Sequence, residues 1–321
     1  MKAAVYYKYG KPEVVSVADV PAPICGNNEI LIQIKYASVN RTDAGFRSAE
    51  YVISRLFSGL FKPKNPVLGC EFSGIVTQVG SEVTDFNVGD RVYGFDDSGF
   101  GSHAEYKTIK ASEPVCVIPH NVDFEIAAAT TEGSHYALCN IRAAKVQKGQ
   151  NVLVYGATGA IGSAAVQLLK HFGATVTAVC RKEHLELVKS LGADVVLDYQ
   201  ATDYTQTTER YHFVFDAVGK SSFGQAKLVL LDGGIYISTE LGKNGENVYK
   251  AITTKFIGKK RLMFPLPIST KEDLKLLGDL VSEGKFKPQI DCVYALNDIV
   301  EAYKYVDSGQ KVGNVLLRLE D

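Results

Sequence analysis

A glycine-rich turn between a short apolar run and a helical stretch constrains the fold of this chain more than any other feature. Asn151–Tyr155 is short and apolar, which predicts a buried strand. Ala160–His171 has the apolar spacing of a helix. The residues between them read Gly-Ala-Thr-Gly. A glycine turn that follows a strand and opens a helix is typical of a phosphate-binding loop.

The loop fits the dinucleotide fingerprint, with alanine at the first glycine position and then Gly159 and Gly162. A missing side chain at Gly159 lets the backbone approach a pyrophosphate, and Gly162 lets the helix pack on the strand. The helix N-terminus adds amide donors and a partial positive charge. We therefore expect the cofactor to contact Ala157, Thr158, Gly159, Ala160, Ile161 and Gly162.

Strand and helix signals alternate through the middle of the chain. Strand signals recur at 174–179, 194–197, 213–215 and 234–237, with helical stretches between them. This alternation predicts βαβ units and a doubly wound parallel sheet in an α/β fold. The first third reads instead as short strands, at 29–35, 72–80 and 91–95. Strand signals at 290–294 and 315–319 flank an amphipathic 297–306, so we expect the C-terminal residues to return to the first domain.

The end of the second strand of the alternating region selects the cofactor. An NAD site usually places an acid there, where it accepts from the ribose 2′-hydroxyl. Here the strand ends in Cys180, Arg181 and Lys182, with no acid before Glu183. Two adjacent cations suit a 2′-phosphate, so these three residues predict NADPH rather than NADH. The alternative is a solvated basic turn at the start of a helix.

Composition excludes several classes of protein. Lys+Arg 35 against Asp+Glu 36 gives a net charge of −1, so no global field attracts nucleic acid or an anionic membrane. No run approaches the ~20 apolar residues of a membrane span, and Tyr7–Lys11 is too polar for a signal peptide. The six cysteines form no Cys-x-x-Cys pair, which favours reduced thiols. We expect a cytoplasmic protein with no nucleic-acid partner and no membrane span.

Four segments resemble the medium-chain dehydrogenase/reductase superfamily: the 157–162 loop, Val79–Val92, Ser38–Asp43 and Gly309–Leu316. Within it, the chain is most similar to the zinc-independent quinone oxidoreductase-like group, with its enone/alkenal reductases and plastid-envelope quinone reductase homologues. The resemblance implies a GroES-like, mainly-β catalytic domain at 1–122 and 290–321, and a Rossmann NADPH-binding domain at 123–289. It also implies an active site in the cleft between them and a homodimer through Rossmann-domain edges.

The zinc-dependent branch of the family holds its metal with a cysteine, a His-Glu pair and a further cysteine. These positions fall on Asn40, on Cys70–Glu71 and near Thr131. Asn and Thr are poor zinc ligands, and 95–103 lacks the cysteines of a structural zinc lobe, so we expect no metal. Cys70 then reads as a small buried residue. The alternative for Cys70, a reactive thiol, requires a lowered pKa.

Without a Lewis acid, hydride from NADPH can still reach an electrophile that polarises itself, such as a quinone or an unsaturated carbonyl (an enone or 2-alkenal). The resemblance places Asn40 beside the nicotinamide and Thr131 near its ribose or carboxamide. Asn40 could instead organise its turn. Tyr51 is a candidate proton donor, with water as the alternative. Two rival functions are a zinc-dependent alcohol or carbonyl dehydrogenase and a non-catalytic NADPH-binding regulatory or structural protein.

The resemblance implies further cofactor contacts in both domains. It places Tyr199 by the adenosine phosphate, the 217–218 pair beside the ribose, and the 264–266 segment at the nicotinamide amide. A lysine common in the family near the C-terminus is replaced by asparagine here, which puts that contact in doubt. His103 reads as a hydrogen-bonded surface or core histidine rather than a catalytic acid. The expected contacts are Tyr199, Ala217, Val218, Phe264, Leu266 and Asn314.

Overall fold

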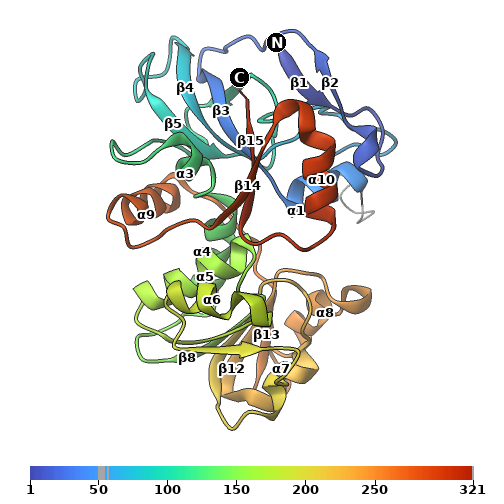
Figure 1. The fold of residues 1–321 in the computed structure, drawn as a ribbon, viewed down its shortest axis with the longest axis vertical. Helices are drawn as coiled ribbons and strands as arrows, with labels where there is room; N and C mark the ends of the chain where they lie inside the picture. The colour runs from blue at the N-terminus through green and yellow to red at the C-terminus, as the bar shows by residue number, and fades with distance from the viewer. Residues whose placement is uncertain (50–54, 56–57, 320–321) are drawn as a thin grey trace. The chain divides into compact units, whose positions relative to one another are not determined.

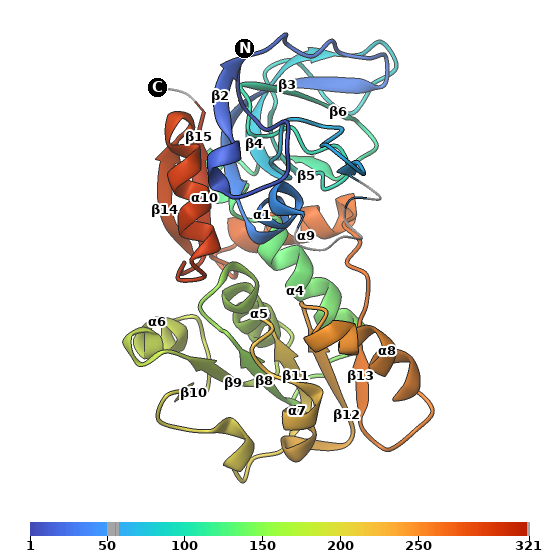
Figure 2. The ribbon, with the colours of Figure 1, turned by 90° about the vertical axis from the view of Figure 1, so that its right-hand side faces the viewer.

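The computed structural model describes residues 1–49, 55 and 58–319. The chain forms two compact units. The first comprises Met1–Glu132, Ser269–Gly284 and Pro288–Asp321, and the second comprises Gly133–Ile268 and Lys285–Lys287. Figures 1 and 2 show the secondary structure of each unit in two views.

The second unit is built on a six-stranded sheet in the order β10-β9-β8-β11-β12-β13, and every neighbouring pair is parallel. This order can be followed across the sheet in Figure 2. The predicted doubly wound parallel sheet is therefore confirmed. The strands are β8 (Asn151–Tyr155), β9 (Thr175–Cys180), β10 (Val195–Asp198), β11 (Tyr211–Asp216), β12 (Leu230–Ser238) and β13 (Arg261–Met263). The helices are α4 (Glu132–Ala143), α5 (Ala160–His171), α6 (Leu185–Ser190), α7 (Phe223–Val229) and α8 (Glu246–Thr253), with short 3₁₀ turns η2 (Lys182–His184), η3 (Tyr204–Gln206) and η4 (Lys243–Gly245).

The first unit is mainly β. Its seven-stranded sheet runs β14-β15-β3-β4-β5-β7, with β6 paired to β3, and β1 and β2 form a separate pair. In β3 the isoleucines at 30, 32 and 34 are buried, as the alternating sequence predicts. The strands are β1 (Lys2–Val5), β2 (Ser16–Asp19), β3 (Glu29–Val39), β4 (Glu71–Val79), β5 (Arg91–Phe95), β6 (Tyr106–Lys110), β7 (Val115–Val117), β14 (Ile290–Ala295) and β15 (Asn314–Arg318). The helices are α1 (Arg41–Ser48), α3 (Phe124–Ala128), α9 (Lys271–Ser282) and α10 (Ile299–Asp307), with η1 (Pro12–Val14) and η5 (Leu296–Asp298).

The C-terminal strands join this sheet as expected, because β15 pairs antiparallel with β3 and parallel with β14. The predicted boundaries, 1–122 with 290–321 and 123–289, differ from the observed units at α3 and α9, which belong to the first unit. Side chains of the first sheet explain both differences. Ser73 Oγ donates to the carbonyl of Phe124 on α3 at 2.6 Å, and Tyr93 Oη donates to the carbonyl of Leu274 on α9 at 2.6 Å.

Two global features were predicted from composition. Among the residues that the structure describes, no helix has the length and apolarity needed to cross a membrane. All six cysteines are unbridged.

Candidate active site

The phosphate-type loop between β8 and α5 contains glycines that the fold needs and one that it does not. Gly156 has φ 83°, a value that favours glycine. A Cβ added to Gly162 would lie 2.1 Å from the Gly156 carbonyl oxygen, so the protein's own packing requires this glycine. Gly159 has an ordinary φ of −69°, and a Cβ there would meet no atom within 4 Å. The space beside Gly159 is open at the N-terminus of α5, where a ligand phosphate can approach the backbone.

The loop lies at the point where the strand order of the parallel sheet reverses. β8 and β11 are neighbours, and the chain continues from β8 to β9 on one side and from β11 to β12 on the other. Ligands of such sheets bind at the carboxyl ends of the strands at this switch point. Val218, which follows β11, lies against the loop, because a Cβ on Gly156 would be 2.5 Å from its Cγ1. The structure thus brings the predicted residues Ala217 and Val218 to the phosphate loop.

The segment after β11 is held by Asp216, which is fully buried. Its carboxylate accepts from the backbone N–H of Val218 at 3.2 Å and of Ser221 at 2.9 Å, and from Tyr236 Oη at 3.1 Å. Burial raises the pKa of Asp216. The side chain fixes the turn rather than projecting from it, so the turn can offer its backbone to a ligand.

At the end of β9 the structure joins three of the predicted cofactor residues. Arg181 Nε donates to Tyr199 Oη at 3.0 Å, and the backbone N–H of Tyr199 donates to the Cys180 carbonyl at 3.1 Å. The Arg181 side chain is 46% exposed, and its Nη1 lies 4.0 Å from the carboxylate of Glu183. An exposed pair at that distance is weak. Lys182 is exposed beside it at the start of η2.

Phe264 and Leu266 follow β13, so they belong to the same carboxyl edge of the sheet as the loop. Phe264 packs against the hydrophobic core of the second unit, whereas Leu266 is 80% exposed. The two predicted residues therefore differ in the side-chain surface that they offer, although both lie at the expected edge.

In the first unit, Asn40 caps helix α1. Asn40 Oδ1 accepts from the Asp43 N–H at 2.9 Å, and the Asn40 N–H donates to Asp43 Oδ2 at 3.3 Å, which together form a capping box. The carboxamide nitrogen has other partners, because Nδ2 donates to Cys70 Sγ at 3.1 Å and to Ser38 Oγ at 3.2 Å. The side chain therefore organises its turn with one end, as one sequence interpretation held, and faces a polar cluster with the other.

Glu71 is the centre of that polar cluster. It is fully buried, and four donors surround its carboxylate. Ser38 Oγ and Asn40 Nδ2 donate to Oε2, while Thr131 Oγ1, at 2.6 Å, and the backbone N–H of Glu132 donate to Oε1. Thr131, predicted to lie near the cofactor ribose or carboxamide, directs its hydroxyl hydrogen to Glu71. We call Ser38, Asn40, Cys70, Glu71, Thr131 and Glu132 the Glu71 cluster.

The side chains of the Glu71 cluster do not provide a set of ligands that fits a zinc ion. Zinc requires at least three anionic or imidazole ligands. Both oxygens of Glu71 already accept hydrogen bonds, and Cys70 is fully buried. Burial, and then the negative charges of Asp43, Glu132 and Glu71, raise the pKa of Cys70 well above its usual range. Among the residues that the structure describes, no group of three or more His, Cys, Asp or Glu side chains is placed to hold a metal.

The burial and the raised pKa of Cys70 do not favour its alternative role as a reactive thiol. A reactive cysteine is a thiolate near neutral pH, which requires a lowered pKa. The Cys70 thiol has no exposed surface, and the carboxyl groups of Asp43, Glu132 and Glu71 lie near it. Cys70 is therefore the small buried residue that its place before Glu71 suggested.

Four residues of this region escaped the sequence analysis: Thr42, Asp43, Glu132 and Lys311. Thr42 Oγ1 donates to Glu132 Oε1 at 2.5 Å. Burial, and then the charge of Glu71, raise the pKa of Glu132 well above its usual range, and burial lowers the pKa of Lys311, which Glu132 partly offsets. The Asn40–Asp43 spacing is a recognisable capping-box signal that could have identified Asp43. Glu132 and Lys311 carry no local signal, because only the fold buries them.

His103 is a hydrogen-bonded core histidine. It is 1% exposed, and its Nε2 lies 2.7 Å from the Ser38 carbonyl oxygen. That oxygen can only accept, so Nε2 carries the hydrogen and Nδ1 faces the Tyr303 hydroxyl at 3.4 Å. Burial lowers the pKa of His103 to about 4, so the ring is neutral at neutral pH. This agrees with the interpretation of His103 as a structural residue.

Two further predicted residues remain. Tyr51, the candidate proton donor, lies outside the described residues. Asn314 is buried at the start of β15, and its Nδ2 donates to the Gln289 carbonyl at 2.9 Å. This amide is used within the first unit, so a cofactor contact would have to replace that hydrogen bond.

Comparisons with known proteins agree with this architecture. Residues 26–120 match the alcohol dehydrogenase GroES-like domain, and residues 191–317 match the family described as zinc-binding dehydrogenase. The chain is 30% identical to 2-methylene-furan-3-one reductase of Solanum lycopersicum over 329 residues, 99% of this chain and 79% of the relative. It is 29% identical to the chloroplastic NADPH-dependent alkenal/one oxidoreductase of Arabidopsis thaliana, with the same coverage of 99% and 79%.

A solved structure matches the fold of this chain over both units. The quinone oxidoreductase from Coxiella burnetii matches with a TM-score of 0.88 and 29% identity, covering 100% of this chain and 99% of that one. The predicted combination of a GroES-like domain and a Rossmann sheet is confirmed. The similarity to oxidoreductases supports an enzyme that uses a nicotinamide cofactor. The chain therefore belongs to the medium-chain dehydrogenase/reductase superfamily, and its relatives include quinone and alkenal or enone oxidoreductases.

Proposed function

We propose that this chain is an NADPH-dependent reductase that transfers hydride, without zinc, to quinones or to the activated C=C bonds of enones and 2-alkenals. Relatives at 29% and 30% identity carry names of this chemistry. Beyond membership of the family, we propose three properties: a preference for NADPH, catalysis without a metal, and this class of substrates.

The absence of a metal requirement rests on one observation, the internal satisfaction of the Glu71 cluster. In the zinc branch this place supplies ligands, but here Glu71 accepts four hydrogen bonds and Asn40 binds Cys70. A carboxylate with both oxygens so engaged is a poor metal ligand. The reaction must then suit a substrate whose carbonyl already polarises the bond that is reduced.

The preference for NADPH rests on Arg181. The guanidinium is half exposed, and Tyr199 holds its Nε at 3.0 Å. Holding Nε leaves the terminal nitrogens of the fork available, and a guanidinium binds phosphate through such paired donors. Lys182 adds a second cation, and the carboxylate of Glu183, which follows this strand, lies 4.0 Å from Arg181 Nη1.

When bound, NADPH supplies the hydride. In this proposal the loop from Ala157 to Gly162 binds the pyrophosphate through backbone N–H groups at the start of α5. Asn40 and Thr131 serve as positioning residues on the first unit, since the Glu71 cluster fixes both side chains. Tyr51 or water delivers the proton. We also propose a homodimer, for which the second unit offers the sheet edges β10 and β13.

The test is NADPH oxidation, followed by its near-ultraviolet absorbance, with a panel of quinones, 2-alkenals and saturated aldehydes. The proposal predicts turnover with quinones or alkenals and little with saturated aldehydes. Turnover confined to saturated aldehydes would favour the dehydrogenase alternative. Tight NADPH binding without turnover on any member of the panel would favour a non-catalytic NADPH-binding protein.

A further inference from the structure

One cysteine of this chain, Cys139, has the surroundings of a nucleophile. Burial is the largest cause that raises the pKa of the other five: Cys25, Cys70, Cys116, Cys180 and Cys292. A thiol with a raised pKa stays protonated at neutral pH and reacts slowly. Cys139 lies on helix α4, is partly exposed and has an imidazole beside its sulfur.

That imidazole belongs to His135, which is buried one helical turn before Cys139. Residues four apart are neighbours on a helix surface. The Cys139 Sγ lies 3.6 Å from His135 Nδ1 and 3.4 Å from the carbonyl oxygen of Ile268. Both atoms can accept a hydrogen bond from the thiol, but only the imidazole can take its proton. A nucleophile with a base within hydrogen-bond reach is the arrangement of an activated thiol.

The charges near Cys139 also differ from those near a comparable cysteine. Arg142 is exposed and follows Cys139 by three residues on α4, a spacing at which side chains are neighbours. A positive charge near a thiol favours the thiolate. Cys25, which is also partly exposed, donates to the carbonyl oxygens of Gly26 at 3.6 Å and Glu29 at 3.3 Å. The charge of Glu29 raises the pKa of Cys25 further, so the two thiols differ in both base and charge.

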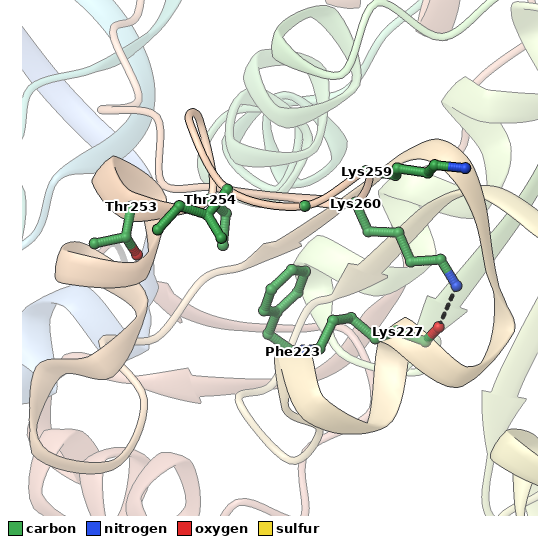
Figure 3. Close-up of a pocket in the computed structure, with 8 residues that line it drawn as sticks. Phe223, Lys227, Thr253, Thr254, Lys259 and Lys260 are labelled. Atoms are coloured by element: carbon green, nitrogen blue, oxygen red, sulfur yellow. Dashed lines mark hydrogen bonds between the residues drawn. The ribbon is translucent and has the colours of Figure 1, made fainter.

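Lysines are the other candidate nucleophiles of the second unit. Three of them line a cavity of about 360 Å³ beside α7, which Figure 3 shows. Lys260 Nζ donates to the carbonyl of Lys227, and Lys259 pairs with Asp232 at 2.9 Å, which raises the pKa of Lys259. An ammonium group has no lone pair with which to attack a carbon atom. These lysines are therefore poor nucleophiles near neutral pH.

We propose that Cys139 is a modification site for α,β-unsaturated carbonyl compounds, the class of electrophile that includes 2-alkenals. The sulfur forms a bond with the β-carbon, and the π electrons of the C=C bond move toward the carbonyl as an enolate. The thiol proton, held by His135, then passes to the α-carbon. An S–H bond and a C=C π bond are replaced by a C–S and a C–H bond, so the step needs no oxidant or reductant. The choice of electrophile rests on the proposed function, because such compounds are among its substrates.

The adduct acts on the segment that follows β13. Alkylation removes the hydrogen that Cys139 Sγ donates to the Ile268 carbonyl, and it adds a carbon chain at that contact. Ile268 is two residues from Leu266, which we expect to lie near the nicotinamide of the cofactor. Loss of this hydrogen bond should weaken NADPH binding about fivefold, the size of one neutral hydrogen bond. An excess of the electrophilic substrate therefore inhibits the enzyme that reduces it.

The test is alkylation of the full chain by limiting 2-propenal without NADPH, followed by mass spectrometry of its peptides. We expect one adduct, on Cys139, and none in Cys139→Ser. His135→Gln replaces the base by a side chain that cannot take the proton. It should slow modification of Cys139 about tenfold, because a thiol of ordinary pKa is only about 3% thiolate at pH 7. Cys25→Ser is the matched control and should be modified at the wild-type rate.

Cys70 reports whether His135→Gln keeps its fold, because Cys70 is fully buried and reacts only in an unfolded chain. Adducts spread evenly over the partly exposed cysteines, or an unchanged rate at Cys139 in folded His135→Gln, would overturn the modification site. NADPH titration before and after alkylation tests the inhibition, and an unchanged affinity of the adduct would overturn it. If the unmodified protein binds no NADPH, the proposed function fails, while the peptide map still decides whether Cys139 is the site.

Discussion

The phosphate loop of the second unit and the Glu71 cluster of the first unit differ in how accessible their polar groups are. The loop leaves its groups open: a Cβ on Gly159 would meet nothing, and the Arg181 side chain is half exposed. The cluster closes its groups on one another, since Glu71 is fully buried and accepts four hydrogen bonds. Polar groups that are accessible to solvent can bind a ligand, whereas buried polar groups that hydrogen-bond to one another stabilise the local structure. We therefore propose that the loop binds the cofactor and that the cluster has a positioning role.

The largest expected effect comes from a substitution that breaks the hydrogen bonds of the Glu71 cluster. Glu71→Gln can put an amide N–H₂ at the Oε1 position, where Thr131 Oγ1 and the Glu132 N–H now donate to the carboxylate. Because each of the two donors left unsatisfied costs about 1–3 kcal/mol, we expect a loss of about 4 kcal/mol in unfolding free energy. Urea unfolding measures it, with the exposed Glu82→Gln as a control that should change stability by less than about 0.5 kcal/mol. An unchanged Glu71→Gln protein would show that the cluster is not closed.

A pH-dependent effect of similar size comes from Asp43, whose pKa burial raises to about 8. The folded protein keeps a proton on Asp43 that the unfolded chain releases above its ordinary pKa of ~4, so this stabilisation is present at low pH and is lost as pH rises through about 8. The cost of Asp43→Asn should therefore be about 4 kcal/mol smaller near pH 8 than near pH 5, from ~1.36 kcal/mol per pH unit. Urea unfolding at the two pH values tests this. A cost that grows with pH would reverse the sign and contradict the burial argument.

Substitutions at two glycines of the loop distinguish an effect on packing from an effect on cofactor binding. Gly162→Ala forces a Cβ within 2.1 Å of the Gly156 carbonyl oxygen and should lower the unfolding free energy by about 1–3 kcal/mol. Gly159→Ala fills only open space, so it should leave stability within about 0.5 kcal/mol and weaken NADPH binding instead. Thermal unfolding and cofactor titration of both variants make the comparison. Equal NADPH affinity in Gly159→Ala and the wild type would remove the loop from the cofactor site.

The smallest effect concerns the choice of cofactor. Arg181→Ala removes a half-exposed cation and should weaken NADPH binding about tenfold, because a charge-assisted hydrogen bond to the 2′-phosphate is lost, while NADH binding changes less than about twofold. Tyr199→Phe, which removes only the hydroxyl that holds Nε, should have a smaller effect of the same kind. Lys189→Ala, on the exposed side of α6, is the control. An equal loss of affinity for NADPH and NADH would contradict the role of Arg181 in binding the 2′-phosphate.

The sequence predicted the second unit well because its signals are local. A strand, a glycine loop and a helix follow one another within 151–171, and the observed β8 and α5 have the expected bounds. The parallel order of the strands also follows from their alternation with helices. Open groups such as Gly159 and Arg181 can be identified from local sequence, because they stand directly after β8 and β9.

The first unit was predicted less completely, because its polar cluster depends on long-range contacts. Glu71 receives hydrogen bonds from Ser38, 33 positions earlier, and from Thr131, 60 positions later. The raised pKa of Glu132 comes from burial, which no short motif encodes. The compact units differ from the expected boundaries at 122 and 289 for a similar reason, since α3 and α9 pack on the first sheet, where Ser73 and Tyr93 donate hydrogen bonds to them.

The central claim is that the closed Glu71 cluster supports reduction without a metal. It is tested most directly by measuring, on one preparation, the zinc content and the NADPH-dependent turnover of a quinone and a 2-alkenal before and after exhaustive chelation. The account predicts sub-stoichiometric zinc and a turnover rate that chelation does not change. One zinc per chain, with activity abolished by chelation and restored by added zinc, would contradict it and make Cys70 and Glu71 metal ligands.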